Sequence, residues 1–498
     1  MASPVHQPDE RTFTGIQIMR GEGVVEAKGF WADAWSQVLK RPGAVISLIW
    51  IGLVAFLAVF APFIASGHPI ILRHLDEGGR VIDTELPLFA TLTATDIILS
   101  VGTIAGAIFL LLPLPLKRSE RLGIVLIGAV QAALIVIACA GFAAYLKRDE
   151  SPDWAITLRQ AAWVPWAVPP SISVAVSMPF LAIPAVRRIG ARIAFVAAVA
   201  LVSAGAAGRG WTEPLVDFEA YESMQSADGA RAVYTLIPWS PSQSRTDLYL
   251  RPPGAIVGEG SDYDASHPLA QRRFLLGTEN IGHDVLSTML HACRLSISIG
   301  VVSTGIAVFI GVTLGALMGY FGGIVDLLLY RVVEIFMAIP VLFLLIVAAA
   351  VLPRDTYVMM AIIGCVTWTG AARFTRAEFL KLRHQDFVQS ARAVGLPLPS
   401  VLFKHMLPNG VTPVLVEASF AIAAAIIIEA TLSYLGLGPD GQPSWGKLLS
   451  STTNQTGGFI WWLAIFPGFA IFLTVLAYNM LGEALRDAID PKLKKPAN

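Results

Sequence analysis

The sequence has few charged residues and no excess of either sign. Only 14% of its 498 residues are Asp, Glu, Lys or Arg, and 36 basic residues balance 36 acidic ones. Nucleic-acid-binding proteins need a clustered basic excess for their phosphate contacts, so this class is excluded. The 55% hydrophobic content and the mean hydropathy of +0.64 exceed what a disordered chain or a soluble globule can carry. The composition therefore predicts an integral membrane protein whose surface contacts the lipid bilayer.

Cysteine is also scarce. Cys139, Cys293 and Cys365 lie in or beside apolar runs without paired spacing, which predicts buried small hydrophobes and neither disulfides nor a zinc site. The eight histidines show no ligand spacing, and no Ser/His/Asp or Cys/His set can be assembled on one side of a membrane. We therefore expect no metal, no cofactor and no enzymatic activity in this chain.

Gly441–Lys447 has the spacing of a phosphate-binding P-loop but lacks the residue that should hold magnesium. Leu448 stands where that loop has Ser or Thr, and Pro443 and Trp445 fit poorly in it. We expect no nucleotide to bind there.

Long apolar runs dominate the rest. Ten runs have membrane-spanning length: 44–65, 88–116, 122–146, 161–186, 191–210, 293–319, 327–352, 357–378, 411–437 and 458–482. Five prolines interrupt 161–186, which could be a broken or re-entrant element. The polar segment that precedes 44–65 is longer than the charged region of a cleavable signal peptide, so this run is expected to be a retained span.

The Lys/Arg asymmetry of the loops sets the orientation. Basic loops, such as those with Lys117-Arg118 and Arg187-Arg188, fall on the same side as both termini, whereas acidic residues offset the basic ones in 66–87, 147–160 and 211–292. Both termini are thus expected inside. The predicted organisation is an inner segment 1–43, a first core span 44–65, an insert with four spans 66–210, an outer region 211–292, five core spans within 293–482 and an inner tail 483–498.

An inner loop at 379–410 is long for a connection inside a compact bundle. Asp386 is placed to cap a helix through 388–394, and Gly395 can take the left-handed conformation that ends it. Ser400 can cap a second helix, which Pro408 is expected to close. A helix, a glycine turn and a second helix form a rigid knob that suits a partner's socket; alternatively, they form an amphipathic hairpin on the lipid headgroups.

Within this loop the sequence resembles the permease subunits of ABC importers, whose signature is Glu-Ala-Ala, three residues, Gly, nine residues and Ile-x-Leu-Pro. Gln389-Ser390-Ala391, Gly395 and His405-Met406-Leu407-Pro408 keep this spacing, with Gln, Ser and His as departures. Gln389 lacks the charge that could pair with an ATPase but can still form hydrogen bonds.

Other segments resemble the oligopeptide and dipeptide branch, C-type. They are 26–65, Leu276–Val285, Gly315–Gly323 and Glu429–Gly438, and the Trp239–Pro253 and Gly482–Pro491 stretches are most similar to the Yej-type permease associated with microcin C and oligopeptide uptake.

The resemblance implies an all-α polytopic fold with a six-helix core, to which four transmembrane helices are added here. It implies a peptide importer in the bacterial inner membrane that works with a second permease subunit, a cytoplasmic ABC ATPase and a periplasmic or extracellular solute-binding protein. The residues expected to couple to the ATPase are Gln389, Ser390, Ala391, Gly395, His405, Leu407 and Pro408. The rivals are a permease for nickel or another small solute and, in a different class, a membrane sensor or structural protein in which the extra spans are the working part.

Several residues inside the spans are candidates for a role. Gly311, Gly315 and Gly319 recur every four residues and predict close helix packing. Glu429 could line the translocation path and attract a peptide amine, or could hold the helix end before Gly436 through local hydrogen bonds. Glu334 is a second path candidate, although with Arg331 it has the spacing of a structural pair. Asp96 and Glu417 lie near span ends, where solvent or headgroups should reach them.

Overall fold

The structure is a computed structural model, and it describes residues 30–76, 79–113, 118–146, 161, 163–183, 189–209, 218, 221, 230–259, 269–453 and 458–489. Among these, eight helices are long and apolar enough to cross a membrane, and two further bent helix pairs raise the number to ten. The prediction of an all-α, multi-pass membrane protein is confirmed, and the predicted ten spans agree with the higher number.

The core bundle is built around one long helix, α11 (Val285–Phe321). Its 37 residues span about 55 Å at a rise of about 1.5 Å per residue, more than the hydrocarbon core of a bilayer. The helices packed around α11 are α3 (Pro42–Ile64), α14 (Thr356–Thr367), α15 (Thr369–Leu382) and α19 (Thr412–Tyr434). Helix α21 (Trp461–Ile489) packs against α3 and α19, and α2 (Phe30–Val38) against α21.

Two predicted spans are bent rather than straight. The run at 327–352 forms α12 (Gly323–Ala338) and α13 (Val341–Val351), which meet at 83°. Pro340 explains this break, because proline lacks the backbone N–H of a helix interior and disfavours helical geometry in Ile339 before it. The run at 357–378 forms α14 and α15, which meet at 44°.

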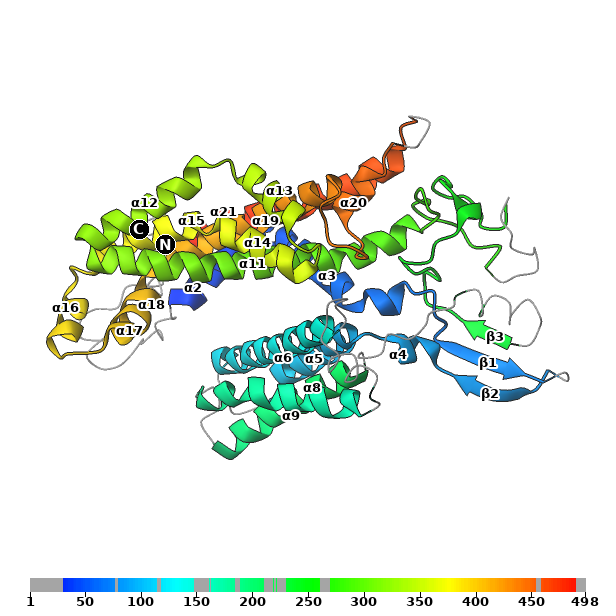
Figure 1. The fold of residues 1–498 in the computed structure, drawn as a ribbon, viewed down its shortest axis with the longest axis horizontal. Helices are drawn as coiled ribbons and strands as arrows, with labels where there is room; N and C mark the ends of the chain where they lie inside the picture. Colours follow the sequence, from blue (N-terminus) through cyan, green and yellow to red (C-terminus); the bar gives the residue numbers. More distant parts are fainter. Residues whose placement is uncertain are drawn as a thin grey trace, which may run out of the picture.

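The insert forms a helical bundle of its own beside the core (Figure 1). It consists of α5 (Ala94–Leu111), α6 (Arg118–Leu146), α8 (Val164–Ser177) continued by η1 (Met178–Ala182), and α9 (Ile189–Arg209). Val164–Ala182 passes the length and hydropathy test for a span despite its prolines. Gln131 is buried among these helices and donates to Ser177 Oγ on α8 and to the carbonyl of Val196 on α9, both at 2.9 Å.

A small antiparallel sheet holds the two ends of the insert together. Strand β1 (Ile71–Leu75) precedes the four insert helices and pairs on one side with β2 (Val81–Glu85) and on the other with β3 (Ala230–Val233), which follows these helices. In the register of β1 and β3, His74 lies opposite Ala230. The short elements nearby are α4 (Pro87–Thr91) and η2 (Thr246–Leu248).

The core therefore has two distinct ends (Figure 1). We call the end with β1, β2 and β3 the sheet end, and the opposite end, which carries the segment 386–410, the hairpin end. Helix α2 and the last turns of α21 lie at the hairpin end, where Ala34 and Val38 pack against Ala484 and Ala488. The ion pair between Arg41 and Asp487, 2.5 Å long, adds to this contact.

Candidate functional site

The hairpin consists of α16 (Asp386–Ala393), α17 (Leu398–Ser400), η3 (Val401–Met406) and α18 (Leu407–Gly410). Gly395 ends α16 with φ of 77°, at the C′ position that the sequence predicts. The N–H of Leu396 donates to the carbonyl of Ala391 at 3.2 Å, and that of Gly395 to the carbonyl of Arg392 at 2.9 Å. This pair of bonds is a Schellman motif, which fixes the angle at which the chain leaves the helix.

Three predicted helix boundaries of the hairpin are wrong. Asp386 is the first residue of α16 and Gln385 precedes it without a side-chain cap, so Asp386 does not cap the helix. Ser400 lies inside helical backbone that begins at Leu398. Pro408 does not close the helix either, because a proline in the first turn of α18 loses no intrahelical hydrogen bond.

The hairpin packs directly on the ends of α11 and α15. Its buried residues form one cluster with the ends of these two helices: Ala316, Phe379, Leu382, Val388, Ala391, Val401, Leu402 and Met406. The guanidinium of Arg392 lies 5.7 Å from the ring centre of Tyr320 on α11. A displacement of the hairpin must therefore be transmitted to α11, because packed interiors deform little.

The outer surface of the hairpin carries apolar side chains among its polar ones. Phe387, Val394, Leu396 and Phe403 are exposed, Val394 to 79%. Apolar side chains exposed together on one protrusion are typical of a protein-interaction surface.

The residues expected to couple to the ATPase differ in their exposure. Ala391 is buried, His405 and Leu407 are half-buried, and Ser390, Gly395 and Pro408 are exposed. The Gln389 amide donates to the carbonyl of Arg383 at 2.8 Å, so it joins α16 to the end of α15. The hydrogen-bonding capacity that Gln keeps is thus used within the chain.

The three glycines of α11 lie against α15 at backbone distance. A Cβ at Gly311 would be 2.6 Å from the carbonyl oxygen of Trp368, and one at Gly315 would be 2.5 Å from that of Ala372. A Cβ at Gly319 would overlap Phe379 Cβ. Only glycine permits this approach, so α11 and the helix leading into the hairpin pack closely over two turns.

Glu429 lies on α19 near the sheet end and has no exposed surface. Its carboxylate accepts hydrogen bonds from Ser433 and Ser444 at 2.7 Å and from Ser296 at 3.4 Å. Ser296 is on α11 and Ser444 precedes α20 (Trp445–Ser450), so Glu429 joins three elements. The bond from Ser433 is the local hydrogen bond of the second alternative above, whereas the bonds from Ser296 and Ser444 come from other elements and were not predicted.

Glu334, the other path candidate, lies on α12 and pairs with Arg331 at 2.5 Å. Both side chains are exposed, 45% for Glu334 and 67% for Arg331. The expected i, i+3 pair is present, and the structure does not bring Glu334 together with Glu429.

The ion pair between Asp96 and Arg294 joins the insert to the core and was not predicted. Asp96 at the start of α5 is 5% exposed and lies 2.5 Å from Arg294 on α11, whose Nε also donates to the carbonyl of Ala58 on α3. The expectation that solvent or headgroups reach Asp96 is therefore wrong. The two residues are 198 positions apart, and the only sequence signal was that each ionisable group lies in or beside an apolar run.

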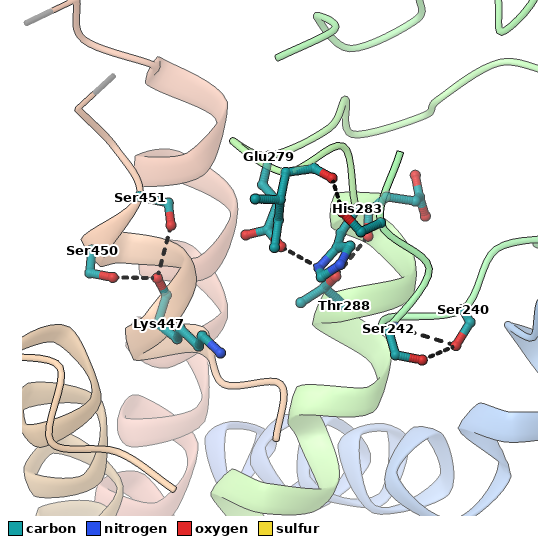
Figure 2. Close-up of polar contacts among 11 residues, drawn as sticks. Ser240, Ser242, Glu279, His283, Thr288, Lys447, Ser450 and Ser451 are labelled. Carbon is teal, nitrogen blue, oxygen red and sulfur yellow. Dashed lines mark hydrogen bonds and ion pairs between the residues drawn. The ribbon is translucent and has the colours of Figure 1, made fainter. Parts of the chain in front are cut away.

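The sheet end is closed by a polar cap on α11. Asp284 caps this helix by accepting from the N–H of Ser287 at 2.7 Å, and burial raises the pKa of Asp284 to about 7. Figure 2 shows the neighbouring Glu279–His283 pair, 2.6 Å long, beside the start of α11, and the turn of α20 in which Ser450 Oγ donates to the Lys447 carbonyl at 2.7 Å. Both His283 and Glu279 are largely buried.

The segment with P-loop spacing is part of this closed end. A Cβ at Gly446 would overlap the carbonyl oxygen of Ala430, so its backbone is packed against α19 rather than left open as a cradle.

Of the cysteines, Cys139 and Cys293 are buried, whereas Cys365 is exposed, contrary to the expectation. Within the described ranges no group of three or more His, Cys, Asp or Glu residues could hold a metal ion.

Comparison with known proteins places this architecture in a family. Residues 311–495 match the binding-protein-dependent transport system inner membrane component, and residues 29–74 match the N-terminal TM domain of oligopeptide transport permease C. Neither range includes the insert helices.

Three relatives illustrate the similarity. The di/tripeptide transport system permease protein DppC of Pseudomonas aeruginosa is 35% identical over 261 residues, 52% of this chain and 82% of the relative. The oligopeptide transport system permease protein OppC of Haemophilus influenzae is 35% identical over 237 residues, 47% of this chain and 76% of the relative. The peptidoglycan transport system permease protein YejE of Agrobacterium fabrum is 38% identical over 218 residues, 44% of this chain and 57% of the relative. The chain belongs to the family of binding-protein-dependent transport system inner membrane components.

Proposed function

We propose that this chain is the permease subunit of an ATP-driven peptide importer in a bacterial inner membrane. Its relatives bear the names of dipeptide, tripeptide and oligopeptide permeases, which favours peptides over nickel or another small solute. Microcin C-like peptides are a narrower possibility within the same class, suggested by the similarity to YejE.

The structure of the hairpin is the main support for this proposal. A glycine-bent protrusion packs on α11 and α15 and presents four exposed apolar side chains, which suits a partner that pushes on it. We infer that this partner is a cytoplasmic ABC ATPase on a separate chain and that this chain itself hydrolyses nothing. Closure of paired ATPases would move the hairpin and rock the helices between inward-open and outward-open arrangements.

The remaining partners follow from the same proposal. A second permease subunit would supply the other half of the path, and a solute-binding protein would deliver the peptide at the sheet end. The hairpin end would then be cytoplasmic, together with both termini, in agreement with the Lys/Arg asymmetry of the loops.

Replacing Gly395 tests the proposal. Nothing lies within 4 Å of a Cβ at this position, so there is open space around the Cβ of Gly395→Val, but φ of 77° is strained for a β-branched residue by about 1–2 kcal/mol. We expect the variant to insert normally and to lose peptide uptake and peptide-stimulated ATPase activity in the assembled complex. Gly395→Asn, which tolerates this conformation, should retain most of both.

Gly441 provides the matched control. It also has a positive φ, 68°, and open space around its Cβ, but it lies near the sheet end. Gly441→Val should leave ATPase coupling intact. Normal uptake by Gly395→Val would contradict the proposal.

A further inference from the structure

Charged groups from three different helices lie in the half of the core nearer the hairpin. They are Arg331 and Glu334 on α12, Arg373 on α15 and Glu417 on α19. Helices α12 and α15 are held together by the Arg376 guanidinium, which donates to both carboxylate oxygens of Asp326 at 2.5 and 2.7 Å. The arrangement of these two helices is therefore fixed at this level.

Arg373 on α15 reaches towards α12. Its Nη1 is 3.7 Å from the sulfur of Met337, which follows Glu334 by three residues on α12. Glu417 on α19 lies beside Gly370, which precedes Arg373 by three residues on α15. The Glu417 carboxylate occupies the space that Gly370 leaves open, 2.6 Å from where a Cβ of Gly370 would be.

These four side chains remain at least partly exposed on the surface of the chain. Arg373 is exposed and a thioether is a weak acceptor for its guanidinium, while Glu417 is half-buried. Arg331 and Glu334 are exposed beside apolar residues such as Leu327 and Leu328. Ionisable side chains in membrane spans face water or protein rather than acyl chains. Two cations and two anions from three helices thus indicate a hydrated surface.

We propose that Arg373, Glu417, Arg331 and Glu334 line a hydrated vestibule in the half of the translocation path nearer the hairpin and bind the peptide through charges of both signs. Glu417 and Glu334 receive ammonium groups, and Arg373 receives carboxylates, whose two oxygens match its planar donors. The ligand class is a zwitterionic or side-chain-charged peptide. This inference rests on the proposed function.

The first test compares two peptide probes, Ala-Glu-Ala and Ala-Lys-Ala, in uptake by the assembled transporter. We expect Arg373→Gln to lower the rate for Ala-Glu-Ala relative to Ala-Lys-Ala by roughly fivefold to tenfold, and Glu417→Gln to shift this ratio in the opposite direction. Lys381→Gln, which removes an exposed cation from the same α15, should leave the ratio unchanged. Unchanged ratios in both vestibule variants would overturn the proposal.

The second test does not depend on transport. Single cysteines at positions 373 and 417, in a chain whose three native cysteines are replaced by alanine, should react with a membrane-impermeant thiol reagent added from the hairpin side. A cysteine replacing Ile49, which is 66% exposed on the apolar helix α3 away from the vestibule residues, should not react. Protection of both vestibule positions would overturn the proposal. If the unaltered transporter takes up neither peptide, the proposed function fails, and labelling alone decides whether the vestibule is hydrated.

Discussion

At the scale of single residues, Glu429 shows how a carboxylate is accommodated inside a membrane span. Three serine hydroxyls donate to it, and only Ser433 comes from its own helix. The sequence allows the local bond at i+4 to be predicted. Ser296 and Ser444 lie 133 and 15 positions away, so nothing in the local pattern indicates them.

Replacing Glu429 separates its two possible roles. Glu429→Leu leaves three hydroxyls without their acceptor and should lower stability by about 2–4 kcal/mol, since a buried polar group without a partner costs about 1–3 kcal/mol. Glu429→Gln keeps an acceptor oxygen and should lose less. The measurement is the apparent melting temperature in detergent. If both variants keep wild-type stability and only uptake of cationic peptides falls, Glu429 is a path residue and the structural role is wrong.

Asp284 makes a pH dependence testable. Burial raises its pKa from 3.8 to about 7, so the folded state binds a proton more tightly than the unfolded state. The stabilisation is complete below about pH 4 and is lost as the pH rises towards 7, by up to about 1.4 kcal/mol per pH unit. Asn also caps helices well, so Asp284→Asn should fold and remove this part of the slope.

The readout is the difference in apparent melting temperature between wild type and Asp284→Asn across pH 4–8. Taking the difference removes the contribution of the neighbouring Glu279–His283 pair, which both proteins share. A difference that stays constant with pH would show that Asp284 is ionised throughout the range.

At the scale of elements, the hairpin shows what the sequence can and cannot predict. Gly395 is correctly placed because a positive φ after a helix is a local property of the chain. The helix boundaries predicted at Asp386, Ser400 and Pro408 are wrong. Each of these residue types can lie inside the first turn of a helix as well as before or after a helix. The packing of the hairpin on Tyr320 joins distant segments and could not be predicted.

The contact between α11 and α15 makes a second prediction at this scale. Gly315→Leu must push α15 away, because a Cβ there already meets backbone atoms, and we expect it to disrupt folding or uncouple the hairpin. A Cβ at Gly305 on the same helix would meet nothing within 4 Å, so Gly305→Leu should be tolerated. Yield of monodisperse protein and peptide-stimulated ATPase activity are the measurements. Equal behaviour of the two variants would contradict the close packing.

At the scale of the whole molecule, the insert helices lie outside the two ranges that match the family models, and we propose that they are a module added to the family core. Strands β1 and β3 bring its two ends side by side, and Asp96 fastens α5 to Arg294 of the core. The four extra spans could be counted from hydropathy, but this attachment depends on residues far apart in sequence. The register of the sheet shows where the insert can be removed.

Because His74 lies opposite Ala230, replacing residues 75–229 with Asn-Gly should form a two-residue hairpin. The deletion leaves Arg294 without its carboxylate, which costs about 3–5 kcal/mol for a buried pair, so Arg294→Met should be introduced with it. We expect this double change to preserve peptide uptake and the deletion alone to fold poorly. A well-folded deletion without uptake would assign the working part to the insert, as in a sensor.

Site-specific crosslinking of the hairpin tests the central claim most directly. A cysteine at Val394, which is 79% exposed on the hairpin, is introduced into the cysteine-free chain and co-expressed with the ATPase subunits; a cysteine at Phe459, 71% exposed near the sheet end, serves as the control. The account predicts a crosslink from position 394 to the ATPase that changes with nucleotide, and none from position 459. A working transporter in which position 394 never crosslinks to the ATPase, or is labelled from outside the cell, would contradict it.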